Sequence, residues 1–427
     1  MKNIALKSVD ADVSPVHPSV NPLVTPSSQP GISVDDDTPR RRGRTGELLG
    51  QVQRLMARMR IAVIYGGDKS QDGSVIFQTC NPRSWKSYEA VAHDIKDSLE
   101  RLGCENVILL PDDMNLGERL REHGIHMAWL NTGGVQGYCS VSHAPAALEM
   151  LGVPYIGHEP LSAGILDSKH VFKRQLIGAG VPTARFLTWH GAQGPLNTGP
   201  DSQFEDVFNG YAGPFIVKPV SGRASLNVEF APDTYCVTAL AEAVYEKTQN
   251  HVLIEQYLGG REYCVAICGP TVMQGGELVR LDKPFTFAHV ERVLAEDERI
   301  FTSMDKKPIT GDRVRAMDPL EEAAVIAELD TLAYMTFDQL DLETLIRLDV
   351  RADESGCLHI LEANPKPDLK APTEDGVTSL IVEGLMNCGM SYDDLILSLL
   401  SDRVDVLFSK RRGSANTLLD LLTACEG

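Results

Sequence analysis

The stretch TLIRLDVRADESGCLHILEANPKP, residues 344–367, carries most of the information about fold and chemistry. It reads as two strands joined by the turn candidate DESG. Because successive side chains of a strand point to opposite faces, Arg347 and Asp349 share one face of the first strand. Glu362 and Asn364 likewise share one face of the second. We therefore predict a hairpin whose two strands are antiparallel neighbours.

If the two faces match, this hairpin brings together two carboxylates, an amide and a guanidinium. Oxygen ligands of this kind suit Mg²⁺, which normally keeps several waters and also binds nucleotide phosphates. The alternative is a solvent-facing sheet with an ordinary ion pair. The abrupt turn EANPKP after the second strand favours the site. We predict that Asp349, Glu362 and Asn364 bind the metal.

Two lysines upstream are candidates for phosphate binding. Lys218 lies within the apolar strand FIVKP, where an unpaired charge is costly to bury, so we expect an anion beside it. Lys169 lies in the first turn of a helix that begins after Asp167 or Ser168, where the helix dipole favours a phosphate. The small-residue loop SGRAS, residues 221–225, offers backbone amides that can cover a phosphate. Each lysine alone also fits a surface residue with a packed stem.

The segment EQYLGGRE, residues 255–262, has a carboxylate at each end. A carboxylate at a strand end can accept the hydroxyls of a ribose, and backbone groups of Gln256 and Leu258 can pair with an adenine edge. The other interpretation is an exposed linker between two strands, and the segment alone does not exclude it.

Composition narrows the class of protein. The chain has 427 residues, 43% of them apolar, with 40 Lys plus Arg against 59 Asp plus Glu, a net charge of −19. Such an acidic chain repels phosphate backbones and anionic membranes, so we expect neither nucleic acid nor a membrane as partner. No apolar run is long enough to span a bilayer, and the N-terminus has no secretory core. The nine cysteines include no CxxC, which favours reduced thiols and a cytoplasmic location.

Strands that meet Gly-rich turns, as in RIAVIYGG and MAWLNTGG, alternate with helix candidates and predict a parallel α/β sheet near the N-terminus. Residues 45–59 have the spacing of an amphipathic helix, which either docks on the body or forms a dimer contact. We expect a charged loop over 282–308 and a long helix over 319–336. The expected organisation is a flexible tail (1–44), the amphipathic helix (45–59), the α/β domain (60–157), two further subdomains (158–256 and 257–401) and a helical tail (402–427).

Together these segments resemble the ATP-grasp superfamily, and within it the D-alanine–D-alanine ligase-like enzymes. The resemblance covers about residues 60–400. Its carriers occur in the family's order: IAVIYGG, GGVQG with LEMLGVPYIG, SKHVFKRQLIGAGVPTARF, PFIVKP with its loop, VLIEQYLGGREYCVAI, and RLDV with LEANPKPD.

The resemblance implies an α+β ATP-grasp fold in which ATP lies between two antiparallel sheets, and a ligase that forms an acylphosphate and then an amide, releasing ADP and phosphate. It implies two Mg²⁺ ions, replaceable by Mn²⁺, at the metal ligands named above. Arg347 would steady the oxyanion. The remaining roles follow the motifs, with catalysis assigned to Arg347, Lys218 and Ser225, and nucleotide binding to Lys169, Lys218, Ser221, Gly222, Glu255, Gln256, Tyr257, Leu258, Glu262 and Arg292.

Departures from the D-alanine ligase pattern fall in the amino-acid pockets. The Glu that follows the first GG is replaced within DKSQDGS, at Gln71 and Asp72, and His-Gly is replaced by Asn131–Thr132. Where the family has an NTSPG-type turn, this chain has NPKPD, and the serine that follows the turn in the family is replaced near 372–373. The tyrosine that the family carries in the loop over the site is missing around Val293. We therefore expect a dipeptide or specialised-metabolite ligase for amino-acid-like substrates, for example in antibiotic biosynthesis. The alternatives are a D-alanine–D-alanine ligase of cell-wall synthesis and a non-catalytic nucleotide-binding regulator. Family habit suggests a homodimer.

Overall fold

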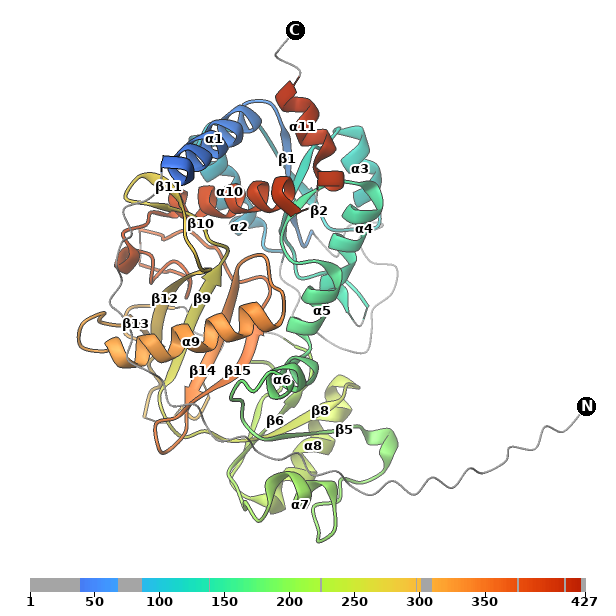
Figure 1. Ribbon diagram of the computed structural model, residues 1–427. Helices are drawn as coiled ribbons and strands as arrows, with labels where there is room; N and C mark the ends of the chain where they lie inside the picture. The colour runs from blue at the N-terminus through green and yellow to red at the C-terminus, as the bar shows by residue number, and fades with distance from the viewer. Residues whose placement is uncertain are drawn as a thin grey trace, which may run out of the picture. The chain divides into compact units, whose positions relative to one another are not determined.

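The structure is a computed structural model that describes residues 39–67, 87–137, 139–222, 225–296, 298–300, 309–374, 376–410 and 412–423. The chain divides into Met1–Pro39 and a compact body, Arg40–Gly427, and the body is the subject below. Its described residues form a mixed α/β structure with one parallel sheet, two antiparallel sheets and a two-stranded hairpin (Figure 1). None of the described helices is both long and apolar enough to cross a membrane.

The N-terminal sheet is parallel throughout, as the alternation of strands and helices predicts. Its strand order is β2-β1-β3-β4. The strands are β1 (Arg60–Tyr65), β2 (Asn106–Pro111), β3 (Met127–Asn131) and β4 (Tyr155–Ile156), and the connecting helices are α2 (Glu89–Arg101), α3 (Leu116–Glu122), η1 (Ser140–Ser142) and α4 (His143–Leu151).

Both faces of this sheet are covered, which explains the unbroken apolar run in β1. Ile61 and Val63 pack in one core cluster with α2 and with α10 (Tyr392–Lys410), while Ala62 and Ile64 pack in another with α3 and α4. The helix α1 (Pro39–Met56) contributes to the first cluster, where Val52 is fully buried. The amphipathic helix therefore docks on the body. It begins six residues before the expected start at residue 45.

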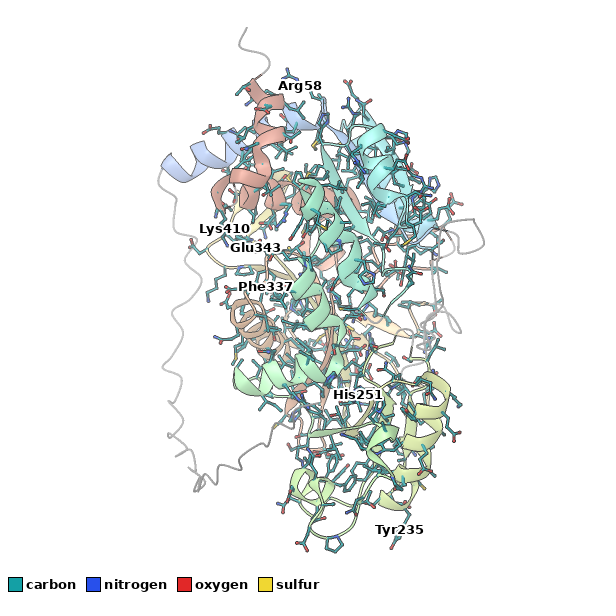
Figure 2. The ribbon with its side chains drawn as sticks, turned by 90° about the vertical axis from the view of Figure 1, so that its right-hand side faces the viewer. Arg58, Tyr235, His251, Phe337, Glu343 and Lys410 are labelled. Carbon is teal, nitrogen blue, oxygen red and sulfur yellow. The ribbon has the colours of Figure 1, made fainter. Side chains whose placement is uncertain are left out.

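The C-terminal helices return to the N-terminal sheet. Asp393 of α10 accepts a hydrogen bond from Ser98 of α2 at 2.6 Å. At its other end α10 contacts the C-terminal subdomain, where Glu343 pairs with Arg403 at 3.3 Å and with Lys410 at 3.7 Å (Figure 2). α10 continues through residue 401, where the sequence suggested a boundary. These elements are α10 (Tyr392–Lys410), η4 (Arg412–Ala415) and α11 (Asn416–Thr423).

The central sheet is antiparallel, with the order β5-β8-β6-β7. Phe204, Phe208 and Phe215 pack against one another on one face of it, with ring centroids 4.6–5.4 Å apart. The elements are α5 (Pro160–Asp167), α6 (Lys169–Gly178), β5 (Phe186–Trp189), η2 (Gly191–Gln193), α7 (Gln203–Phe208), β6 (Phe215–Pro219), β7 (Glu229–Ala231), α8 (Thr234–Thr248) and β8 (Val252–Gln256).

The second antiparallel sheet has the order β13-β12-β9-β14-β15. The long helix α9 packs on it through Leu329, Leu332 and Phe337. The elements are β9 (Glu262–Cys268), the hairpin β10 (Thr271–Gln274) and β11 (Glu277–Arg280), β12 (Phe285–Arg292), β13 (Val314–Ala316), α9 (Ala323–Gln339), β14 (Ile346–Ala352), β15 (Leu358–Asn364) and η3 (Met386–Cys388).

One element corrects the sequence analysis. The segment expected to be a charged loop over 282–308 contains β12, an interior strand that pairs with β9 and β13. Its register shifts between Phe287 and Val290, and Ala288 has a positive φ of 52°. This bulge breaks the alternation of apolar and polar side chains, so the strand pattern is hidden in the sequence. Residues 301–308 lie outside the described part of the chain.

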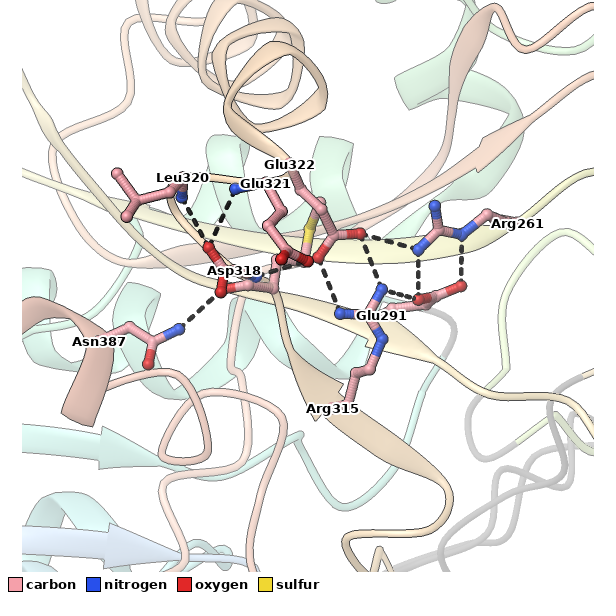
Figure 3. Close-up of polar contacts among 9 residues, drawn as sticks. Arg261, Glu291, Arg315, Asp318, Leu320, Glu321, Glu322 and Asn387 are labelled. Atoms are coloured by element: carbon pink, nitrogen blue, oxygen red, sulfur yellow. Dashed lines mark hydrogen bonds and ion pairs between the residues drawn. The ribbon is translucent and has the colours of Figure 1, made fainter.

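Four charged side chains join the edge of this sheet to the start of α9, and we call Arg261, Glu291, Arg315 and Glu322 the edge network (Figure 3). Arg261 lies 2.6 Å from Glu291 and 2.9 Å from Glu322, and Arg315 lies 2.7 Å from Glu322. The two arginine side chains are 41–49% exposed. The network therefore fixes β9, β12 and β13 from the solvent side.

Candidate active site

A cavity of about 240 Å³ is lined by β6 and β8 of the central sheet and by β14 and β15 of the C-terminal sheet. All the site residues expected from the sequence line it except Ser221. Ser221 follows β6 and accepts a hydrogen bond from Asn250 at 2.9 Å. The expected residues that line the cavity are Lys169, Lys218, Gly222, Ser225, Glu255, Gln256, Tyr257, Leu258, Glu262, Arg292, Arg347, Asp349, Glu362 and Asn364.

The hairpin β14–β15 has the predicted pairing. Arg347 lies opposite Asn364, and Asp349 lies opposite Glu362. The register shifts by one residue between the pairs Asp349–Glu362 and Val350–Ile360, because Leu361 of β15 is an extra residue there, while β14 itself stays regular against β9. The four polar side chains therefore share one face of the sheet and all reach the cavity, as side-chain alternation predicts.

Asp349 is held by two guanidinium groups. Its carboxylate lies 2.7 Å from Arg347 Nε and 2.8 Å from Arg292 Nη2. Arg292 also binds Glu262 at 2.7 Å, so it bridges two carboxylates from different strands. Burial raises the pKa of Asp349, but the charges of Arg292 and Arg347 outweigh burial and lower it well below the usual range. Asp349 is therefore an anion at neutral pH.

Lys169 connects the start of α6 to β15. The helix begins at Lys169 itself, after the N-cap Ser168, which confirms the predicted first-turn position. The Lys169 ammonium lies 2.9 Å from Glu362. Burial raises the pKa of Glu362, but the charge of Lys169 contributes to a net lowering. A cation at the helix start thus faces one of the expected metal ligands.

A buried ion-pair triad lies at the back of the cavity. Glu255 of β8 lies 2.5 Å from Lys218 and 3.0 Å from Lys173, whose side chain is fully buried. Lys173 also donates to Thr183 Oγ1 at 2.5 Å. Burial raises the pKa of Glu255, but the charges of Lys173 and Lys218 outweigh it and lower the pKa to about 2. The anion expected beside Lys218 is therefore Glu255 in this structure.

Sequence reasoning missed Lys173, although a signal was present. Lys173 follows Lys169 by four residues, and on a helix that spacing places both side chains on one face. The spacing therefore indicates a second buried cation under the first. Glu255 is fixed between ammonium groups, so its carboxylate is not positioned as a simple ribose acceptor.

Tyr257 is anchored by Arg351, a second residue that sequence reasoning missed. The Arg351 guanidinium lies 4.7 Å from the centre of the Tyr257 ring and donates to its hydroxyl at 2.9 Å. Arg351 also lies 3.4 Å from Glu262. The backbone N–H of Gln256 donates to Arg185 at 2.9 Å, so this N–H is used within the protein. Arg351 follows Asp349 by two residues, and strand alternation places it on the cavity face.

The other end of the cavity is lined by Tyr88, Lys366 and Pro367. Of the positions that depart from the D-alanine ligase pattern, Asn131 accepts a hydrogen bond from Lys366 at 3.3 Å, and Thr132 donates to Asp112 at 2.8 Å. Val293 follows β12 and is 39% exposed. Gln71 and Asp72 lie outside the described residues.

The cavity therefore brings lysine and arginine cations together with a carboxylate pair and an amide. Lysine ammonium groups and a nearby helix start suit phosphate oxygens. Two carboxylates and an amide oxygen suit Mg²⁺ in the presence of those phosphates. The arrangement fits phosphoryl transfer, in which positioning and charge neutralisation supply most of the rate.

A family model described as "D-ala D-ala ligase C-terminus" matches residues 176–401. An uncharacterized protein, y4sG, from Sinorhizobium fredii is 28% identical over 268 residues, which cover 62% of this chain and 71% of the relative. A D-alanine–D-alanine ligase from a Synechococcus strain is 25% identical over 310 residues, which cover 72% of this chain and 86% of the relative.

Among solved structures, a D-alanine–D-alanine ligase from Bacillus anthracis complexed with ATP resembles this chain with a TM-score of 0.58. The match covers 82% of this chain and 98% of that one, at 21% sequence identity. The likeness confirms the predicted fold, with a parallel N-terminal sheet and two antiparallel sheets.

Proposed function

The chain belongs to the D-ala D-ala ligase C-terminus family, and we propose that it is an ATP-dependent ligase that joins a carboxylate to an amine. The observation that carries the proposal is the cavity, where residues of two antiparallel sheets bring Lys169 and Lys218 opposite Asp349 and Glu362. The proposed substrates are ATP and two amino-acid-like molecules, and the products are an amide, ADP and phosphate.

Lys169 and Lys218 are proposed to bind the phosphates of ATP. Lys173 and Glu255 are positioning residues, because their ion pairs fix the Lys218 ammonium at the cavity wall. Gly222 and Ser225 follow β6, line the cavity and are proposed to cover the phosphates with backbone and hydroxyl groups, while Ser221, which lies outside the cavity, is proposed to support this loop through its contact with Asn250.

The nucleoside is proposed to lie against the end of β8. Tyr257 and Leu258 line the cavity there, and Arg351 anchors the Tyr257 ring. Gln256 borders the adenine, and Glu262 is proposed to accept the ribose hydroxyls. Arg292 holds the Glu262 carboxylate at 2.7 Å and thereby sets its direction.

The donor set fits Mg²⁺ at Asp349, Glu362 and Asn364. The described residues contain no cluster of three or more His, Cys, Asp or Glu that could hold a metal by itself. Mg²⁺ requires no such cluster, because one or two carboxylates together with phosphate oxygens and waters suffice. When bound, the ion neutralises negative charge on the phosphate oxygens.

The chemistry proceeds in two balanced steps. A substrate carboxylate oxygen forms a bond to the γ-phosphorus of ATP while the bond to the β–γ bridging oxygen breaks, giving an acylphosphate and ADP. The neutral amine then forms a bond to the acyl carbon, inorganic phosphate leaves with the electron pair of the broken C–O bond, and the amine nitrogen loses a proton. The Arg347 guanidinium is proposed to stabilise the oxyanion between addition and loss of phosphate.

Three finer expectations stay predictions from the sequence. These are a pair of Mg²⁺ ions with Mn²⁺ as a substitute, a homodimer, and a cytoplasmic location. A second candidate function is D-alanine–D-alanine ligation, which the names of several relatives favour. The changed positions Asn131 and Val293 favour a different amino-acid pair.

The test is ADP release from Mg·ATP by the full chain over pairs of D- and L-amino acids, with mass spectrometry of the products. We expect amino-acid-dependent ADP release and an amide product, with little D-alanyl-D-alanine. D-alanyl-D-alanine as the best product would promote the second candidate. ADP release that no amino acid stimulates would contradict the ligase assignment.

A further inference from the structure

The residues that follow the metal-binding strand β15 line the cavity directly. Pro365, Lys366, Pro367 and Asp368 come immediately after Asn364, the last residue of β15, and all of them border the cavity. In the proposed reaction a substrate carboxylate attacks the γ-phosphorus of ATP, so this carboxylate must lie near the proposed metal ligands. The residues after β15 are therefore placed to contact the substrate that supplies the carboxylate.

Asp368 differs from most carboxylates of the cavity. Within the described part of the chain it forms no ion pair, and its one hydrogen bond is from the backbone N–H of Lys370 to Oδ1 at 3.1 Å. Asp167, also in the lining, interacts with other groups of the chain. The carboxylates of the cavity that pair with a lysine or arginine are Glu255, Glu262, Asp349 and Glu362.

The two lysines nearest to Asp368 in the sequence have other neighbours. The Lys366 ammonium lies 3.3 Å from the centre of the Tyr88 ring and 3.3 Å from Asn131 Oδ1. Burial raises the pKa of Asp94 on α2, and the charge of Asp368 adds to this rise while the charge of Lys370 opposes it. Lys370 therefore lies between two carboxylates and balances only one of them.

The backbone around Asp368 is fixed on both sides. Leu369 is buried in the core, and its carbonyl accepts a hydrogen bond from the Tyr392 hydroxyl at 2.8 Å. Further along, the backbone N–H of Ala371 donates to Asp94 at 3.0 Å. Pro367, on the other side, fixes its own φ angle. A carboxylate on such a turn loses little conformational entropy when it binds a cation.

We propose that Asp368 binds an ammonium group of the substrate that supplies the carboxylate, one that takes no part in the bond formed. The proposal rests on the ligase function proposed above. The ammonium is either the α-ammonium of that amino acid or a cationic group in its side chain, and both offer the same N–H donors to the Asp368 carboxylate. Asp368 thereby selects a substrate that carries a positive charge.

The experiment measures what an ammonium group on the carboxylate donor contributes, with the amine donor held constant. One arm compares the best amino acid with its desamino analogue, and the other compares lysine with norleucine. Mass spectrometry quantifies the amide product of each. For the wild type we expect kcat/KM to be at least ~10-fold higher for the ammonium-bearing member of one arm. Asp368→Asn should lose this preference mainly through KM for the carboxylate donor, with KM for ATP unchanged.

Two further variants separate charge from structure. Asparagine keeps an acceptor for the Lys370 N–H, so Asp368→Asn should retain the turn. Asp368→Glu keeps the charge and should retain part of the preference. Glu374→Gln is the matched control, because Glu374 is exposed and does not line the described cavity. It should leave the preference unchanged.

The outcomes distinguish this proposal from the ligase function. A wild-type enzyme without a preference in either arm would overturn the role of Asp368 and leave the ligase function standing. A preference that persists in Asp368→Asn, whether or not all rates fall together, would also overturn it and assign Asp368 to the turn alone. Absence of amino-acid-dependent ADP release with every pair would contradict the ligase function itself.

Discussion

Neighbouring residues of β12 belong to two different ion-pair networks. Glu291 joins the edge network with Arg261, whereas Arg292 points to the cavity and binds Glu262 and Asp349. The same division separates Arg261 from Glu262 at the start of β9. Strand alternation sends adjacent side chains to opposite faces, so one sheet carries a solvent-facing network and a buried one made of the same residue types.

The charges of the cavity, which also include the triad of Glu255, Lys173 and Lys218 on the central sheet, differ from the edge network in burial and therefore in desolvation cost. Glu322 of the edge network has its pKa lowered to about 2, chiefly by hydrogen bonds from Arg315. Glu255 in the cavity has a pKa of about 2 as well, although burial raises it and two lysine charges must outweigh that effect. A buried network that costs desolvation free energy is a poor way to stabilise a fold. A role in binding a ligand explains these buried charges better than a role in stabilising the fold.

The largest expected difference, between the Glu255 triad and the edge network, is in the free energy of unfolding. Glu255→Gln leaves Lys173 and Lys218 buried without their shared counter-charge, and we expect a loss of about 3–5 kcal/mol in the free energy of unfolding. Glu322→Gln, in the edge network, should cost at most about 1 kcal/mol. Urea denaturation at pH 7 measures both. Equal losses would contradict the distinction between buried and solvent-facing networks.

The next difference is in turnover. Asp349→Asn and Glu362→Gln should fold but lose at least ~100-fold in amino-acid-dependent ADP release, because each removes a charge that serves the transferred phosphoryl group. Glu291→Gln, which alters the edge network on the same sheet, is the control and should keep near-wild-type activity. Turnover close to wild type in both cavity variants at saturating Mg²⁺ would remove them from the metal site.

Arg347→Ala separates catalysis from nucleotide binding within the cavity. The guanidinium is proposed to act on the oxyanion, so we expect a lower kcat with ATP affinity largely retained. Kinetics at varied ATP, together with equilibrium titration of ATP, distinguish the two effects. A variant that no longer binds ATP would show that Arg347 serves the nucleotide and not the intermediate.

Acid should reduce the difference in unfolding free energy between the wild type and Glu255→Gln. A carboxyl whose pKa is lowered on folding stabilises the protein fully above its unfolded pKa, near 4.5 for Glu255, and this contribution is lost as the pH falls towards 2. The difference in stability between the wild type and Glu255→Gln should therefore be constant from pH 7 to about 5 and shrink below pH 4.5. A difference that grows on acidification would mean that the Glu255 pKa is raised, not lowered.

The smallest effect is expected outside both networks. Deleting residues 1–40 should change activity and melting temperature little, because their Pro- and Ser-rich composition supports no core. Extending the deletion to residue 59 removes the fully buried Val52, Leu55 and Met59 and should destabilise the body strongly. Thermal melts of the two truncations test this, and similar melting temperatures would contradict the docking of α1.

The sequence predicts best where chemistry and periodicity coincide. The hairpin β14–β15 has a short turn and side chains that alternate along each strand, so its antiparallel pairing and the shared faces of Arg347 with Asp349 and of Glu362 with Asn364 follow from local pattern, whereas the bulge that sets Asp349 opposite Glu362 does not. β12 was missed because the bulge at Ala288 breaks the period and charged residues surround it. The start of the parallel sheet was also predictable, since β1 and β3 each end at a Gly-rich turn.

Contacts between distant strands were beyond sequence reasoning. Nothing local indicates that Arg292 bridges Glu262 and Asp349, because the bridge depends on the order of strands in the sheet. Lys173 had a local signal in its spacing from Lys169, but its full burial depends on Glu255, 82 positions later in the printed sequence. Resemblance to a family supplied the candidate residues, and only the three-dimensional structure shows which charges pair.

The most direct test of this account is a calorimetric titration of Mg·ATP into three proteins: the wild type, Lys218→Met from the cavity, and Arg315→Met from the edge network. We predict that the wild type and Arg315→Met bind with the same affinity, and that Lys218→Met binds about 10- to 100-fold more weakly, since a charge-assisted contact to phosphate is lost. No binding to the wild type, or an equal loss in both variants, would contradict the assignment of the cavity to the nucleotide.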